Sequence, residues 1–103
     1  MVRYSYHEAI VLTRDQLIES IVRHIIEIQT ASGRSAESIN EMTELFGDIN
    51  GFDSLNGIEA LVLVGVDIDK KLSTELLFPD GDIPVTVGSL ANSILKQIGR
   101  AHV

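Results

Sequence analysis

A serine that follows a glycine and an acid stands at the predicted start of a helix near the middle of the chain. The segment from Gly51 to Leu55 is GFDSL, and Ile58 continues an apolar pattern compatible with a helix. We expect Leu55 and Ile58 to face inward, which places the Ser54 hydroxyl where a loop becomes a helix. The first turn of a helix has unpaired N–H groups and the positive end of the helix dipole. A phosphate ester on Ser54 would therefore be attached where the backbone favours negative charge.

The same segment also has a simpler explanation, because Asp and Ser are common helix-capping residues. Two further matches accompany it: Glu59 stands five residues after Ser54, and Thr86 to Leu90 is TVGSL. The chain is also small, acidic and free of cysteine. Taken together, these features resemble the acyl carrier proteins. That family has a G-x-D-S-L attachment motif, an acid on the exposed face of its second helix, and a T-V-G-x-L opening of its last helix.

The resemblance implies an all-α fold, a small acyl-carrier-protein-like four-helix bundle with three main helices and a short one. Residues 1–12 would form an N-terminal extension and residues 13–103 the carrier domain. Ser54 would carry 4′-phosphopantetheine, whose terminal thiol holds an acyl group as a thioester. Asp53 and Leu55 would flank the attachment point. The chain would not be an enzyme, because catalysis in this family belongs to the partners.

The resemblance also implies which surface the partners use. A phosphopantetheinyl transferase would modify the chain, and acyl-loading and acyl-transferring enzymes would dock on the second helix through Glu59, Asn56 and Val62. Glu59 is the only acid in that helix before Asp67, so the face is more apolar than is usual in the family. We therefore expect a specialised carrier in a lipid, polyketide or cell-surface pathway. The alternative is a helical protein-interaction module of similar fold in which the serine is never modified.

Composition supports a single soluble domain. The chain has 103 residues, 45% of them hydrophobic, which is enough for one domain with a real core. Eight basic against fifteen acidic residues give a net charge of −7, which argues against nucleic acid or an anionic membrane as partner. The longest apolar run, residues 60–64, is too short for stable membrane insertion. His7, His24 and His102 lack the spacing of metal ligands. We expect a cytoplasmic monomer without a bound metal.

Hydrophobic periodicity predicts where the helices lie. Thr13 and Gln16 have the form of a capping box, and apolar residues at helical spacing follow until the chain reaches Ser32. Before this helix, residues 1–12 suggest an irregular or strand-like lead-in. A short helix is expected over residues 38–46, inside a long polar connection. Residues 78–84 form a turn, and Thr86 should cap a last helix that ends at Gly99.

The second helix is the ambiguous element. Apolar residues at spacings of three or four predict a helix from Leu55 to Leu72, in which Gly57 and Gly65 each cost about 1 kcal/mol relative to Ala. The run LVLVGV from Leu61 to Val66 is equally compatible with a buried parallel strand. In that alternative α/β fold, residues 62–68 and 83–87 would be strands and residues 70–77 a helix. Because the apolar phase continues without a break, the sequence favours the helix.

Overall fold

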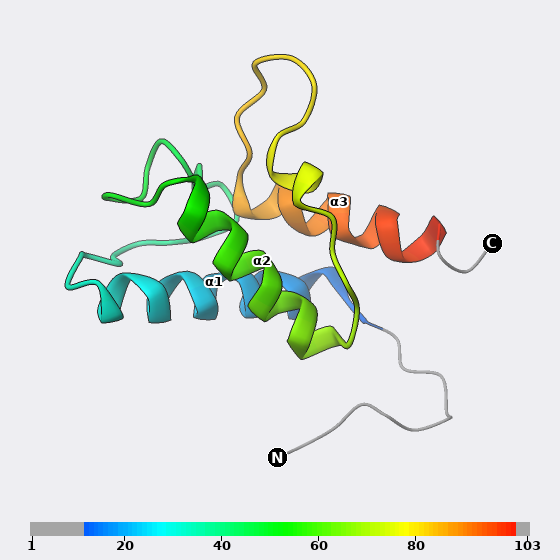
Figure 1. Cartoon of the computed structure of the whole chain (residues 1–103), viewed down its shortest axis with the longest axis horizontal. Helices are drawn as coiled ribbons and strands as arrows, with labels where there is room; N and C mark the ends of the chain where they lie inside the picture. The colour runs from blue at the N-terminus through cyan, green and yellow to red at the C-terminus, as the bar shows by residue number, and fades with distance from the viewer. Residues whose placement is uncertain (1–11, 101–103) are drawn as a thin grey trace.

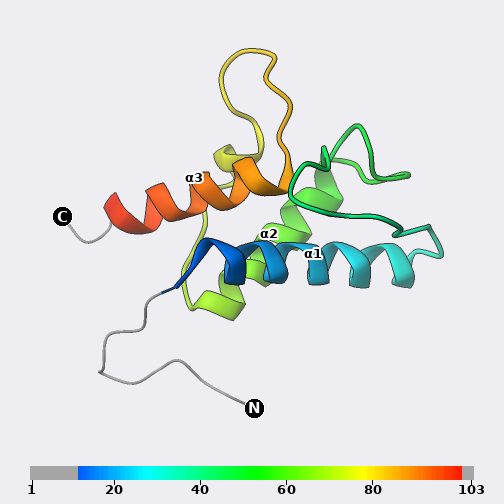
Figure 2. The same cartoon turned by 180° about the vertical axis from the view of Figure 1, so that it is seen from behind.

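The computed structural model describes residues 12–100 of the chain. This part contains three α-helices and one short 3₁₀ helix, joined by loops. In chain order they are α1 (Arg14–Ala31), α2 (Ser54–Ile68), η1 (Thr74–Leu77) and α3 (Val87–Arg100). Helix α2 crosses α1, and α3 also packs on α1 (Figures 1 and 2). The all-α prediction is confirmed for these residues, whose only β-type pairing is an isolated bridge between Glu44 and Thr86. The strand-like lead-in predicted for residues 1–12 lies, except for Leu12, outside the described residues.

Helix α1 begins and ends where the sequence predicts. The Thr13 Oγ1 atom accepts a hydrogen bond from the N–H of Gln16 at 3.1 Å, and the Gln16 Oε1 atom accepts one from the N–H of Thr13 at 3.0 Å. This reciprocal pair satisfies two backbone donors at the helix start. The helix ends at Ala31 with Ser32 as its C-cap, and Gly33 follows with a positive φ of 72°, a conformation that a side chain disfavours.

A single hydrophobic core lies between the helices and beneath the long α1–α2 loop. Each fully buried aliphatic side chain contributes about 1.5–3 kcal/mol through removal from water. The buried apolar residues are Leu17, Ile21, Ile25 and Ile28 of α1; Ala60, Leu61 and Val64 of α2; Val87, Leu90, Ala91 and Ile94 of α3; and Leu45, Ile49, Phe52, Leu77 and Val85.

Within the described residues, no helix is both long and apolar enough to cross a membrane.

The short helix predicted over residues 38–46 does not form. Ser38 has a positive φ of 60°, which interrupts any helix there. The Thr43 Oγ1 atom accepts from the N–H of Asn40 at 2.9 Å, and the Asn40 Oδ1 atom accepts from the N–H of Met42 at 2.8 Å. These local side-chain bonds compete with helical ones, as Asn and Thr side chains commonly do. The only short helical element in the described part is η1, later in the chain.

The long loop instead pairs with the entrance to α3. The N–H of Leu45 donates to the carbonyl of Val85 at 2.9 Å. The first two residues of α3, Val87 and Gly88, donate their N–H groups to the carbonyls of Thr43 at 3.0 Å and Glu41 at 2.8 Å. Loop carbonyls therefore satisfy backbone donors that the start of a helix leaves unpaired.

Helix α2 is shorter than predicted. It ends at Ile68, because Asp69 adopts the left-handed conformation with φ 58°. The N–H of Lys70 then turns back to the carbonyl of Gly65 at 2.9 Å, which closes the last turn. Leu72, expected in the same helix, lies in the following connection and packs partly buried against the core. The strand alternative for residues 62–68 is wrong, since α2 includes all of them.

Candidate functional site

Ser54 is the first residue of α2, and it is exposed. Asp53 is the capping residue: its Oδ1 atom accepts from the N–H of Asn56 at 3.0 Å, and its carbonyl accepts from the N–H of Gly57 at 3.0 Å. Among the described residues, no side-chain hydrogen bond involves the Ser54 hydroxyl. Asp53 therefore does the capping, and the hydroxyl of Ser54 stays accessible at the positive end of a fifteen-residue helix.

Asn56 completes the cap and connects it to the loop. Its Oδ1 atom accepts from the N–H of Asp53 at 3.1 Å and from Nη2 of Arg34 at 2.9 Å. The Arg34 side chain reaches this point by crossing Gly51, where an added Cβ would lie 2.5 Å from its Cδ atom. Asn56 is thus half-buried and already bonded within the chain. Its predicted role as a partner contact remains a prediction.

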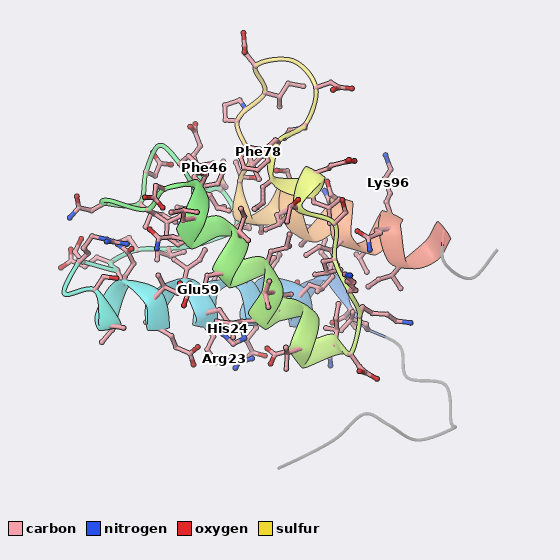
Figure 3. The ribbon with its side chains drawn as sticks, viewed as in Figure 1. Arg23, His24, Phe46, Glu59, Phe78 and Lys96 are labelled. Carbon is pink, nitrogen blue, oxygen red and sulfur yellow. The ribbon has the colours of Figure 1, made fainter. Side chains whose placement is uncertain are left out.

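A group of phenylalanines lies beside the first turn of α2. A Cβ added to Gly57 would be 2.8 Å from the Cζ atom of Phe46, so the glycine makes room for the ring. The Phe46 ring stacks on Phe52 and on Phe78, with ring centroids 6.1 Å apart in both pairs. Figure 3 shows Phe46 and Phe78 close to the N-terminal end of α2. Phe46 and Phe78 remain 39% and 52% exposed, which leaves an aromatic surface near Ser54.

The outer face of α2 is an apolar stripe with one acid. Leu55, Glu59, Val62 and Val66 recur at spacings of four, three and four, which aligns them on one side of a helix. All four are exposed. The prediction that Leu55 is buried as an anchor is wrong, because its side chain is 73% exposed. Val62, predicted as a partner contact, is at the surface with 58% exposure. Glu59, which stands between Leu55 and Val62 in the sequence, is also exposed and is labelled beside α2 in Figure 3.

The far end of α2 is joined to α1 by a polar cluster around Asp67. Its Oδ2 atom accepts hydrogen bonds from Ser20 Oγ at 2.7 Å and from Arg23, and it lies 2.8 Å from His24 Nε2. His24 Nδ1 is 2.8 Å from a carboxylate oxygen of Glu27. Figure 3 shows Arg23 and His24 next to the C-terminal half of α2. Burial alone would raise the pKa of Asp67, but the bonds from Ser20, His24 and Arg23 and the attraction of His24 lower it overall.

Two contributors to the site were not foreseen from sequence. Arg34 follows Ser32-Gly33 in a polar stretch, and nothing in the pattern of that stretch indicates a role for its side chain. Phe46 was expected in a helix rather than over Gly57. A glycine in the first turns of an otherwise good helical pattern is the one feature that could have indicated a close neighbour.

Ser54 presents an exposed hydroxyl at the start of α2. The buried His24 is bonded to Glu27 of its own helix α1 and to Asp67 near the C-terminal end of α2, whereas Ser54 lies at the N-terminal end of α2. Within residues 12–100, no three His, Asp or Glu side chains are grouped to hold a metal ion. Comparisons of the chain with protein-family models, curated proteins and solved structures give no significant match.

Proposed function

We propose that this protein is an acyl carrier, modified with 4′-phosphopantetheine on Ser54. The observation that carries the proposal is the accessible Ser54 hydroxyl on the first residue of α2, directly after the capping Asp53. A phosphodiester there would meet the favourable end of the helix dipole. The order of elements also supports it: a first helix, a long connection, a serine-led second helix and a last helix agree with the acyl-carrier resemblance, although the short helical element is η1, after α2, and not in the long connection where it was expected.

The chain itself contributes a fixed attachment point and a docking surface. In the modification, Ser54 Oγ forms a bond to the β-phosphorus of coenzyme A, the diphosphate P–O bond breaks, and adenosine 3′,5′-bisphosphate leaves. The hydroxyl proton goes to a base of the transferase. The long arm then raises the effective concentration of its acyl cargo at a docked enzyme. The outer face of α2, with Leu55, Glu59 and Val62 exposed, is the surface next to the attachment point.

The test is the intact mass of the protein after incubation with coenzyme A, Mg²⁺ and a promiscuous phosphopantetheinyl transferase. We expect one phosphopantetheine per chain, and none on Ser54→Ala. Ser73→Ala is the matched control, because Ser73 is also an exposed serine at a helix start but caps η1. It should be loaded like the wild type. An unmodified wild type, or a labelled Ser54→Ala, would refute the proposal.

A second candidate is supported by the apolar stripe on α2. Three exposed aliphatic residues on one helix face, Leu55, Val62 and Val66, are typical of a surface that binds another protein. In that case the protein would be an unmodified interaction module with a carrier-like fold. The mass experiment separates the two functions, because only the carrier is labelled.

A further inference from the structure

A buried glutamine anchors the loop that leads to Ser54. Gln29, near the end of α1, is fully buried. Its Nε2 group donates to the carbonyl of Ser35 at 2.8 Å and to that of Asn50 at 2.7 Å. The amide oxygen accepts from Nε of Arg34 at 3.2 Å. One side chain therefore ties both ends of the α1–α2 loop, and a buried polar group with all its partners in place fixes local geometry.

Arg34 extends this network from the buried amide to the first turn of α2. Its Nε group bonds Gln29, while Nη2 bonds the Oδ1 atom of Asn56 at 2.9 Å. That same oxygen accepts from the N–H of Asp53, so Asn56 receives the bridge on one side and closes the helix cap on the other. The rigid guanidinium can span both acceptors at once, which a lysine ammonium on its flexible stem cannot reproduce.

We propose that Gln29 and Arg34 are positioning residues, which hold the Asp53–Asn56 cap and thereby fix the direction in which Ser54 is presented to the modifying enzyme. The proposal rests on the carrier function for its kinetic part. Among residues 12–100 no side-chain hydrogen bond orients the Ser54 hydroxyl directly, so its presentation depends on the turn on which it sits. That turn is joined to the buried part of α1 through Arg34. In the described residues Arg34 makes no ion pair with a carboxylate, and its two side-chain partners are amide oxygens of this network.

The decisive variant is Arg34→Ala in the full chain, compared with Arg14→Ala. Arg14 is a matched control, because it also bridges two elements through two bonds, to Asn92 at 2.7 Å and Glu41 at 3.1 Å, but does so at the start of α1. Two measurements apply to both: loading kinetics with coenzyme A and a phosphopantetheinyl transferase, and amide hydrogen exchange at Asn56 and Gly57, whose N–H groups bond Asp53. Both variants should remain folded by circular dichroism.

For Arg34→Ala we expect kcat/KM of loading to fall about threefold to tenfold, the worth of one or two hydrogen bonds, with faster exchange at Asn56 and Gly57. Arg14→Ala should leave the loading rate within about twofold of the wild type, as expected for a site without shared partners, and leave those two amides unchanged. Arg34→Lys should behave like Arg34→Ala. Combining Arg34→Ala with Asn56→Ala should be no worse than Asn56→Ala alone.

Three outcomes would overturn the proposal. They are full activity of Arg34→Lys, additive losses in the double variant, or unchanged exchange at Asn56 and Gly57 in Arg34→Ala. The exchange measurement does not depend on modification. If the wild type is not loaded at all, the carrier function fails, and the exchange data still decide whether Arg34 positions the turn.

Discussion

Gly65 is expected to be essential to the end of α2, in contrast to the other glycine of that helix. A Cβ placed on Gly65 would lie 2.5 Å from the backbone oxygen of Lys70. This oxygen belongs to the chain as it turns back after Asp69, and the Lys70 N–H bond to Gly65 holds it there at 2.9 Å. Backbone cannot move aside as a side-chain tip can. The substitution Gly65→Ala should therefore open the last turn.

The magnitude follows from opposing contributions. Replacing a helical glycine by alanine favours folding by about 1 kcal/mol. Overpacking in a closed site costs about 1–3 kcal/mol, and loss of the turn-closing hydrogen bond costs about 1 kcal/mol more. We expect a net destabilisation of about 1–3 kcal/mol, which for a domain of this size lowers Tm by about 4–8 °C per kcal/mol.

Gly57→Ala is the matched comparison within the same helix. Its added Cβ meets the ring tip of Phe46 at 2.8 Å, and that partly exposed ring can swing outward. The gain in helix propensity and the cost of moving the ring should nearly cancel, leaving a change within about 1 kcal/mol. Urea denaturation of both variants gives the free energies of unfolding. If Gly65→Ala proves as stable as Gly57→Ala, the tight contact between Gly65 and Lys70 is wrong.

Three further predictions concern the rest of α2. Leu61→Ala removes a side chain that is only 1% exposed and should lower the free energy of unfolding, measured by urea denaturation, by about 2–5 kcal/mol. Val62→Ala, on the exposed face of α2, should change it by less than about 0.5 kcal/mol. Equal losses would contradict the assignment of Leu61 to the buried face and Val62 to the exposed face. Because the pKa of Asp67 is lowered from 3.8, its contribution to stability is present above that pH and is lost as the pH falls through the folded-state value. The wild type should therefore exceed Asp67→Asn in Tm at pH 7, with the gap narrowing below about pH 4; a constant gap would refute this linkage. Glu59→Lys should slow loading by the transferase, with a defect that shrinks as salt rises; a salt-independent defect would instead indicate the apolar stripe.

Helix starts were predictable because their causes are local. The Thr13–Gln16 pair and the Asp53 cap each depend on residues within one turn, so sequence alone locates the starts of α1 and α2. Leu55 shows the limit of spacing arguments. Each step of three residues turns the side-chain direction by about 300° around the helix axis, which is less than a full turn. Apolar residues repeated at every third position therefore move gradually from one face of the helix to another. Leu61 and Val64 therefore face the core while Leu55 faces solvent.

The parts that could not be predicted depend on distant partners or on local backbone conformations that an apolar pattern does not reveal. The loop around Thr43 is shaped by local polar bonds and by pairing with Val87, which no pattern within residues 38–46 reveals. The end of α2 depends on the left-handed Asp69, which an apolar pattern continuing to Leu72 conceals. Of the candidate site, the serine and its cap were predictable, but Arg34 was not, because its partners Gln29 and Asn56 are joined only in the folded chain.

The capping of α3 by loop carbonyls has a consequence for the order of folding. Val87 and Gly88 find their acceptors in Thr43 and Glu41, so the start of the last helix is not complete until the loop between α1 and α2 is in place. Bringing such distant segments together has an entropic cost that must be met before the contacts form. Helix α3 is therefore expected to gain its first-turn protection together with the loop, as one cooperative unit, rather than to add independently to a finished α1–α2 pair.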